Sequence, residues 1–351
     1  MSRFFSSRFA NLTPYTPGEQ PQDMAYTKLN TNESPFPPSE KALAWAAEHT
    51  KSLNLYSDPA CRLLTQKLAE VYGVGEDMVL VTNGSDEALN FAFMAFCDED
   101  HPALFPDITY GFYPVYADLN HVPYEEVPLT EDFSIDLEEY KKRKGTVFLA
   151  NPNAPTGKAF PSAAIEDLAA ADPDRIVVVD EAYVDFGAES CVPLVGKYDN
   201  VLVIQTYSKS RSLAGARLGY AIGCPALISD LNTIKFSTNP YNINSYSMAV
   251  GIGSLLNDAE NKAHCAVIAE NRVYTVGKLK ELGFEVVDSR ANFVFAKHPA
   301  ISGQEIYEKL KANGVLVRHF TKERIKEYNR ITIGTKEQMD ILFETFRKIW
   351  G

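Results

Sequence analysis

The middle of the chain alternates short, continuously apolar runs with stretches of helical periodicity. The runs between residues 60 and 224 are too short for helices: Met78–Thr82, Ala103–Phe105, Thr146–Ala150, Ile176–Asp180, Val201–Gln205 and Leu218–Ile222. Several are rich in β-branched residues, which is typical of strands buried on both faces. Strands that alternate with helices predict an α/β fold with a mostly parallel sheet wrapped by helices.

The pattern changes after about residue 240. A long helical stretch is followed by shorter strand-like and helical segments, at 259–282, 284–288, 292–297, 303–313, 315–318, 330–333 and 336–349. This order predicts a smaller α+β domain at the C-terminus. Residues 1–45 are rich in Pro, Asn and Tyr and show little periodicity. We therefore expect an N-terminal arm at 1–45 that adds to the small domain, a large domain at 46–245 and the small domain at 246–351.

Size and composition support two lobes in an ordinary globular protein. The 351 residues exceed the ~250–300 at which a single core stops growing. A net charge of −12 argues against nucleic acid or an anionic membrane as the main partner. No apolar run approaches the ~18 residues of a membrane span. The cysteines form no C-x-x-C pair, and we interpret them as reduced thiols of a cytoplasmic protein.

Ligands of α/β sheets bind at the carboxyl ends of the strands, so the residues after each apolar run are candidates for a site. Gly84, Ser85 and Asp86 follow the run 78–82 and open an amphipathic helix, whose N-terminus can hold a phosphate. By itself this signal is weak, because most such junctions bind nothing. Asn153 lies in a rigid Pro- and Gly-rich turn, which alone predicts only a tight loop.

Two charged residues at strand ends are harder to explain structurally. Asp180 ends a buried apolar run and needs a cation or several hydrogen-bond donors. Mg²⁺ is one candidate, but no second carboxylate cluster accompanies Asp180, so we expect no metal. Lys209 follows the run 201–205, and three polar side chains surround it in sequence: Thr206, Ser208 and Arg217.

One ligand would use all of these side chains. Pyridoxal 5′-phosphate (PLP) requires a lysine for its aldehyde and an acid to keep its ring nitrogen protonated. It also requires a helix N-terminus, hydroxyls and an arginine for its phosphate. Tyr110 would cover the ring, and Tyr183 would donate a hydrogen bond to the ring's 3′-oxygen. The sequence therefore predicts that Lys209 carries PLP and that Asp180 faces its ring nitrogen.

The order of these motifs resembles that of the aspartate-aminotransferase fold, the PLP-dependent transferase fold type I. The match is closest to histidinol-phosphate aminotransferases, which are similar at Leu12–Gly18, Lys28–Pro35, Tyr56–Pro59, Val315–Arg318 and Arg330–Thr335. The resemblance implies that Arg330 holds the substrate α-carboxylate and that Arg318 and Tyr15 contact its phosphate end. It also implies a substrate-binding role for Asn32. Tyr56 would reach across a homodimer interface to the partner's PLP phosphate.

Three residues depart from the pattern of that family. Ala154 replaces the Asn that usually precedes Pro-Thr-Gly, and Asn153 lies one position earlier. Ser34 replaces an Asn found in many members. Arg211 adds a cation two residues after Lys209, where members more often have a neutral side chain. These changes leave the substrate less certain than the reaction.

We predict a PLP-dependent aminotransferase that converts L-histidinol phosphate and 2-oxoglutarate to imidazole acetol phosphate and glutamate in histidine biosynthesis. An aromatic-amino-acid aminotransferase or a threonine-phosphate decarboxylase would use the same scaffold. A non-catalytic PLP-binding regulator would need a DNA-binding module, and no basic helix-turn-helix segment is visible. A nicotinamide-dependent dehydrogenase would need a G-x-G-x-x-G motif after the first strand, which is missing.

Overall fold

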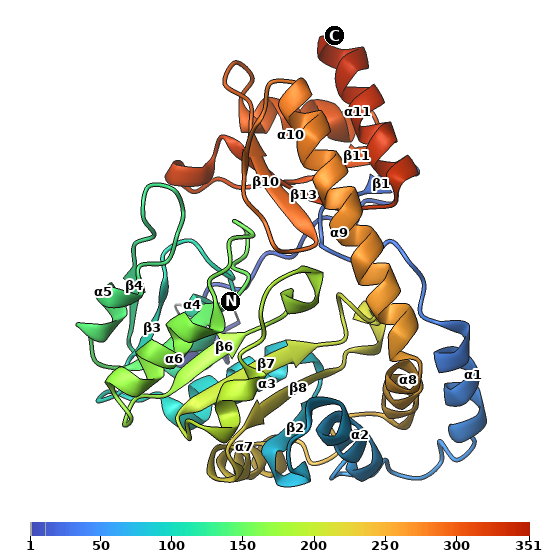
Figure 1. The fold of residues 1–351 in the computed structure, drawn as a ribbon. Helices are drawn as coiled ribbons and strands as arrows, with labels where there is room; N and C mark the ends of the chain where they lie inside the picture. The colour runs from blue at the N-terminus through green and yellow to red at the C-terminus, as the bar shows by residue number, and fades with distance from the viewer. Residues whose placement is uncertain (1, 11) are drawn as a thin grey trace.

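The computed structural model describes residues 2–10 and 12–351. A seven-stranded sheet flanked by helices forms the lower part in Figure 1, and a four-stranded sheet with its own helices forms the upper part. Helix α9 (Asp258–Glu281) runs from one part into the other. No helix within the described residues is long and apolar enough to cross a bilayer.

The large sheet has the strand order β2-β8-β7-β6-β5-β3-β4. Its strands are β2 Val79–Thr82, β3 Ala103–Pro106, β4 Tyr124–Val127, β5 Thr146–Ala150, β6 Val177–Asp180, β7 Val201–Thr206 and β8 Gly219–Gly223. β8 is antiparallel to β2 and β7, while the other neighbours pair in parallel, so the mostly parallel prediction is confirmed. The apolar pattern did not reveal β4, because this edge strand buries only Val127.

Helices cover both faces of this sheet because successive strand residues point to opposite sides. Val177 and Val179 of β6 belong to one apolar core, while Val178 belongs to the other. The first core packs against α1, α2, α6 and α8, and the second against α3, α4 and α7. The helices are α1 Glu40–His49, α2 Arg62–Tyr72, α3 Gly84–Phe96, α4 Tyr113–Asn120, α5 Leu137–Lys141, α6 Ser162–Ala171, α7 Pro225–Thr238 and α8 Ser245–Leu256.

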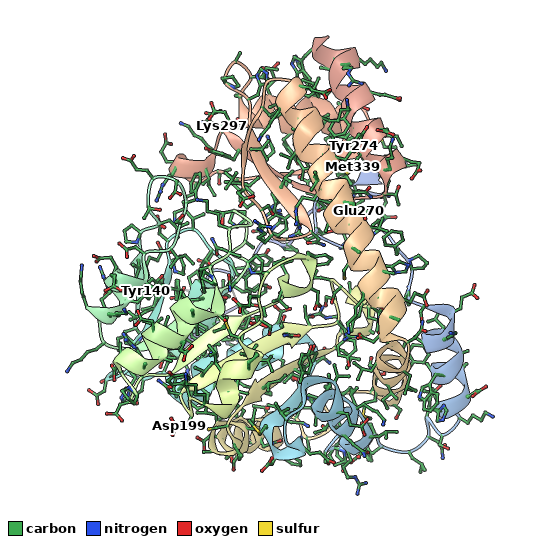
Figure 2. All side chains as sticks on the ribbon, viewed as in Figure 1. Tyr140, Asp199, Glu270, Tyr274, Lys297 and Met339 are labelled. Atoms are coloured by element: carbon green, nitrogen blue, oxygen red, sulfur yellow. The ribbon has the colours of Figure 1, made fainter. Side chains whose placement is uncertain are left out.

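The smaller part is built on an antiparallel sheet of order β12-β13-β10-β9. Its strands are β9 Glu285–Val287, β10 Phe293–Lys297, β12 Arg318–His319 and β13 Tyr328–Thr332. Helices α9, α10 (Gly303–Ala312) and α11 (Lys336–Trp350) pack around a third core, to which Tyr274 of α9 and Met339 of α11 contribute (Figure 2). The N-terminal arm joins this part, since β1 (Thr27–Lys28) pairs in parallel with β11 (Val315–Leu316).

Short 3-10 helices complete the chain, at Ser7–Phe9, Glu76–Met78, Val184–Phe186, Val192–Gly196, Ala214–Ala216 and Glu323–Ile325. The one at 214–216 belongs to the loop that follows β7 and leads to β8. This loop carries Lys209, so its fixed shape bears directly on the site.

We predict that Gly219→Ala destabilises the fold, because β8 passes very close to the start of α3. A Cβ at position 219 would stand 2.4 Å from both Gly84 C and Ser85 N. Backbone must move to relieve such a clash, so the free energy of unfolding should fall by about 1–3 kcal/mol. Denaturant unfolding of the variant measures this change. Gly196→Ala is the control, since a Cβ there meets nothing within 4 Å, and equal losses in both variants would contradict the prediction.

Candidate active site

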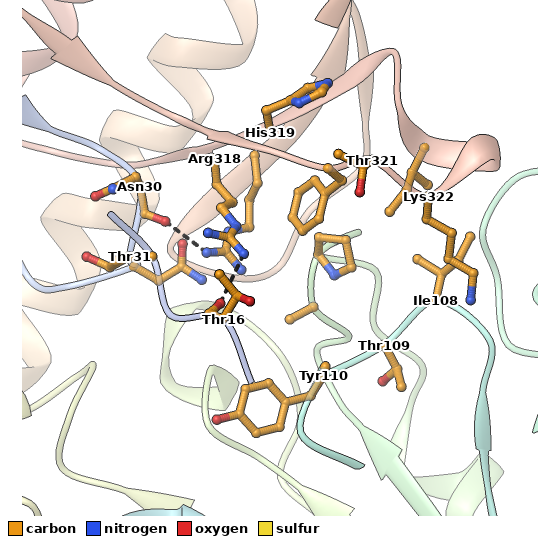
Figure 3. Close-up of a pocket in the computed structure, with 18 of the residues that line it drawn as sticks. Thr16, Asn30, Thr31, Ile108, Thr109, Tyr110, Arg318, His319, Thr321 and Lys322 are labelled. Atoms are coloured by element: carbon orange, nitrogen blue, oxygen red, sulfur yellow. Dashed lines mark hydrogen bonds between the residues drawn. The ribbon is translucent and has the colours of Figure 1, made fainter. Parts of the chain in front are cut away.

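A cavity of about 730 Å³ lies where the arm, the large sheet and the small sheet meet. Seven of the predicted site residues line it together: Tyr15, Asn32, Tyr110, Tyr183, Lys209, Arg318 and Arg330. Figure 3 shows the polar side chains that converge on this space from the separate segments. Residues as far apart in sequence as the arm and β13 are thus brought to one site.

Lys209 lines the cavity from the loop after β7. Its Nζ donates a hydrogen bond to the carbonyl of Thr31 at 3.1 Å and lies 5.9 Å from the ring centroid of Tyr183. Burial, followed by the positive charge of Arg330, lowers the pKa of Lys209 to about 8. A substantial fraction of this amine is therefore neutral near physiological pH, which is the form that can attack a carbonyl carbon.

Asp180 ends β6 and is buried. Its carboxylate accepts hydrogen bonds from Ala182 N at 3.1 Å and from the Tyr113 hydroxyl at 3.1 Å. Burial raises the pKa of Asp180 to about 6, although both hydrogen bonds oppose the shift. A carboxyl group held in this way favours a cationic partner. Sequence reasoning missed Tyr113, because the aromatic run 110–113 does not indicate which ring faces the acid.

Tyr183 is oriented by the N-terminal arm. Asn32 has a positive φ of 56° and donates its amide N–H to the Tyr183 hydroxyl at 3.0 Å. Thr332 of β13 in turn donates to the Asn32 side-chain oxygen at 3.1 Å. Burial raises the pKa of Tyr183, so its phenol remains protonated and can donate a hydrogen bond. Asn32 therefore contributes to the site by fixing this phenol.

The start of α3 and Arg217 form a cradle of the kind that holds a phosphate. Helix α3 begins at Gly84, so its first N–H groups have no intrahelical partner. The Arg217 Nη2 atom lies 2.9 Å from Asp86 Oδ2, and Asp86 also accepts from Tyr110 at 2.7 Å. A Cβ at position 84 would stand 2.6 Å from Arg217 Nη2. The guanidinium can occupy this position only because residue 84 has no side chain.

Two predicted hydroxyls lie just before Lys209, Thr206 at the end of β7 and Ser208 on the loop. Thr206 donates a hydrogen bond to the Ser208 hydroxyl at 3.0 Å, and both side chains are buried. The backbone N–H of Ser208 donates to Thr206 Oγ1 at 3.1 Å. These bonds fix the backbone that leads from β7 into the Lys209 loop.

Arg318 and Arg330 place two cations on neighbouring strands at the outer side of the cavity. They face each other in the register of β12 and β13. Arg330 donates to the carbonyl of Asn30 at 2.9 Å, while its buried Nε finds no hydrogen-bond partner within the described residues. Arg318 reaches the carbonyl of Thr16 only at 3.4 Å (Figure 3) and that of Pro17 at the same distance. Guanidinium groups with such incomplete hydrogen bonding favour an anionic ligand.

Asn153 and Tyr56 are, like the residues around Asp180 and Arg217, not part of the cavity lining. The Asn153 amide donates to Ile108 O at 3.0 Å and to Thr156 Oγ1 at 3.1 Å, and its oxygen accepts from Thr109 at 2.8 Å. These bonds occupy its side chain within the turn. Tyr56 lies on the surface with 84% of its area exposed, stacked on Tyr241 at 4.5 Å.

The three departures from the family pattern have different surroundings. Ala154 lines the cavity. Ser34 accepts a hydrogen bond from Ser212 at 2.8 Å and so ties the arm to the Lys209 loop. Arg211 is buried and pairs with Asp258, away from the cavity lining. The Arg211 side chain therefore turns into the large domain, so any effect of this departure on the substrate would be indirect.

The sequence pattern of the family described as aminotransferase class I and II matches residues 25–346. The chain belongs to this family. This aminotransferase is 48% identical to the histidinol-phosphate aminotransferase of Clostridium beijerinckii, over 99% of this chain and 98% of that protein. The family predicted from the sequence is confirmed.

Solved structures show the same fold. The histidinol-phosphate aminotransferase of Sinorhizobium meliloti, solved in complex with pyridoxal-5′-phosphate, is 23% identical and has a TM-score of 0.84, covering 92% of this aminotransferase and 91% of that chain. The L-threonine-O-3-phosphate decarboxylase of Porphyromonas gingivalis is 21% identical, with a TM-score of 0.81, over 92% of this chain and 98% of that one. The predicted fold type I architecture is confirmed, and the fold alone does not decide between transamination and decarboxylation.

We predict that Lys209 is acylated at lower pH than an ordinary lysine. Competitive labelling of the cofactor-free chain with acetic anhydride, read out peptide by peptide by mass spectrometry, should give a midpoint near its pKa of about 8. Lys142 is the internal control, because its hydrogen bond to Glu139 raises its pKa above the usual value. A Lys209 midpoint as high as that of Lys142 would contradict the environment described here.

Proposed function

We propose that this aminotransferase carries PLP on Lys209 and transfers the amino group of histidinol phosphate to a 2-oxo acid, 2-oxoglutarate in the simplest case. One observation carries the proposal: two arginines with incomplete hydrogen bonding share a cavity with a lysine of lowered pKa. The similarity to the Clostridium beijerinckii enzyme over nearly the whole of both chains supports the choice of substrate.

The residues present fit the cofactor. Asp180 would face the ring nitrogen, and Tyr183 the 3′-oxygen. Tyr110 would lie against the ring, and the cradle of α3 and Arg217 would receive the phosphate, assisted by the hydroxyls of Thr206 and Ser208. When bound, PLP supplies an electron sink for the carbon that carries the amino group. The glycine at position 84 supports this assignment, because any side chain there would displace Arg217.

Lys209 is the residue that moves the proton. Its amine, held beside Tyr183 and depressed in pKa, would remove a proton from the carbon that carries the amino group and return it at the adjacent position. Asp180, ionised opposite a cationic nitrogen, would hold the ring nitrogen's proton in place. The low-dielectric cavity strengthens both interactions.

Two cations suit a cavity that must accept two different anions in turn. Histidinol phosphate carries a phosphate monoester and no carboxylate, whereas 2-oxoglutarate carries two carboxylates. Arg330 is anchored by Asn30 and partly unsatisfied, so we assign to it the anionic group nearest the reacting carbon. Arg318 is held only by long contacts to the arm and would bind the remote anionic group.

We predict that the purified aminotransferase forms glutamate from histidinol phosphate and 2-oxoglutarate. Arg318→Gln and Arg330→Gln should each lower kcat/KM about 10–100-fold, because a hydrogen bond to a charged group is worth about 1.5–3 kcal/mol. Lys209→Ala should reduce the rate by ~10²–10⁴-fold or more. Borohydride reduction and peptide mapping should place the cofactor on Lys209.

The control for the arginine variants is Arg62→Gln. Arg62 is the first residue of α2, and its exposed guanidinium pairs with Asp58. Carbon dioxide release from O-phosphothreonine, or turnover of phenylalanine, without turnover of histidinol phosphate would replace the proposed substrate. Cofactor trapped on another lysine would overturn the assignment of Lys209.

We further propose a cytoplasmic homodimer. We expected a large domain at 46–245 and a small domain at 246–351 with the 1–45 arm. Because α1 and α8 pack in the core of the large sheet, we extend the proposed large domain over α1 and through Leu256. Tyr56 would complete the partner's site. The exposure of an aromatic pair, Tyr56 on Tyr241, supports an interface here, because such patches on soluble proteins often mark contact surfaces.

Mixing two inactive variants tests the shared site. Lys209→Ala subunits lack the amine but keep Tyr56, and Tyr56→Ala subunits have the reverse defect. Hybrid dimers should therefore contain one intact site and regain up to half of the specific activity per dimer. The control mixes Lys209→Ala with Asp180→Ala, whose hybrids also pair one defective subunit of each kind. If Tyr56 instead acted within its own subunit, no hybrid would contain an intact site. The mixture would then show no more activity than the two variants measured separately.

A further inference from the structure

Arg211 points away from the cavity although it follows Lys209 by two residues. Its side chain is 8% exposed, and its guanidinium carbon lies 5.3 Å from the ring centroid of Tyr207. Lys209 and Arg211 therefore project from the same loop in different directions. The buried guanidinium of Arg211, so close in sequence to a reactive lysine, requires an explanation, because burial of a charge is costly unless the charge is paired.

The ring beneath Arg211 belongs to a cage of three tyrosines with fixed positions. Tyr207 meets Tyr220 edge-on at 5.6 Å, and Tyr220 packs against Tyr72 at 5.8 Å. The hydroxyls of Tyr72 and Tyr220 donate to Gln205 Oε1 at 2.6 and 2.8 Å. Gln205 in turn donates to the buried carboxylate of Glu181 at 2.8 Å. Two walls of the cage are thus hydrogen-bonded to Gln205 of β7, which in turn binds the residue that follows Asp180.

The acidic partner of Arg211 lies on a different element. Arg211 Nη1 is 2.8 Å from Oδ1 of Asp258, the first residue of α9, whose side chain is 20% exposed. Lys262 also pairs with Asp258 at 2.7 Å, but its own side chain is 79% exposed. Arg211 is therefore the buried partner of this carboxylate and Lys262 the solvated one.

Helix α9 contacts the Lys209 loop a second time. Cys265 Sγ lies 3.8 Å from the carbonyl oxygen of Ser210, the residue between Lys209 and Arg211. The same helix continues into the small domain, where it packs in the core that supports β13 and Arg330 (Figure 1). Arg211 and Ser210 thus join the loop of the reactive lysine to a helix that packs in the same core as β13, the strand that carries Arg330.

We propose that Arg211 is a positioning residue, whose buried pairing with Asp258 and packing on Tyr207 hold the Lys209 loop in register with helix α9. This inference rests on the proposed function, because it concerns the placement of Lys209 for proton transfer. A buried ion pair adds little net stability after desolvation. What it supplies is a fixed geometry, which matters where a displacement of about 1 Å can reduce a rate ~10²-fold.

The experiment measures the placement of Lys209 without relying on activity. Competitive acetic anhydride labelling of the cofactor-free chain gives the Lys209 midpoint in the wild type, Arg211→Met and Asp258→Asn. Lys209 is surrounded by the charges of Arg330, Glu33, Asp86 and Arg217, and burial is the main cause of its low pKa. A loosened loop admits water, so the midpoint should rise by about one pH unit in both variants.

The two variants separate position from charge. Loss of a nearby carboxylate would by simple electrostatics lower the pKa of a lysine, whereas loss of a nearby guanidinium would raise it. A rise in both variants therefore indicates displacement of Lys209. In the holoenzyme, kcat should fall about tenfold in both, with KM changed less than kcat.

The matched control is Arg175→Met, which removes a similarly buried arginine that lies two residues before β6. Arg175 is 5% exposed and donates to the carbonyls of Tyr140 and Arg143 at 2.6 and 3.2 Å. This variant should lose stability without moving the Lys209 midpoint. An unchanged midpoint in Arg211→Met, or a lowered or unchanged midpoint in Asp258→Asn, overturns the inference. If borohydride still traps the cofactor on Lys209 in that case, the proposed function stands and only the role of Arg211 fails.

Discussion

The parallel pairing of β5, β6 and β7 is the constraint on which the site depends. In this register Asp180 lies beside Ala150 of β5 and Ile204 of β7, so the segments that follow all three strands leave the sheet at one edge. The turn after β5, the Asp180 carboxylate and the Lys209 loop are therefore neighbours, although about 60 residues of sequence separate the first from the last. A one-residue slip would turn Asp180 toward the opposite face of the sheet.

The sheet edge supplies only half of the cavity, and the arm and small domain supply the other half. Thr31 accepts from Lys209, and Asn32 binds both Tyr183 and Thr332, so two consecutive arm residues connect the large domain to β13. The pairing of β1 with β11 helps to hold the arm in this position, together with the hydrogen bond from Arg330 to the Asn30 carbonyl. Closure of the cavity is thus coupled to the order of a segment that has almost no secondary structure of its own.

Sequence reasoning was strongest where a pattern has a direct physical cause. The buried strands were predicted from their apolar runs. Lys209 and Asp180 were predicted as site residues because they lie at or just after the ends of these runs. What the pattern could not give was the direction of a side chain within a loop. Asn153 and Arg211 lie next to the site in sequence. The Asn153 side chain nevertheless binds backbone near its own turn, and the Arg211 side chain points into the large domain. Tyr113 could not be separated from its aromatic neighbours, and β4, mostly exposed, has no apolar run.

The pKa values of Lys209 and Asp180 show what this arrangement does to stability. Asp180 has a folded pKa of about 6, above its usual value of 3.8, so its burial destabilises the fold increasingly as pH rises through that interval. Lys209 has a folded pKa of about 8, below 10.5, so its burial destabilises the fold at pH values below that interval and the effect fades as pH rises through it. Near pH 7 both groups therefore oppose folding of the empty chain. A ligand that brings a cationic nitrogen to Asp180 and engages the Lys209 amine removes both penalties together. Between about pH 6 and pH 8 both penalties are present in full, so the buried groups that equip the site oppose the stability of the fold that carries it.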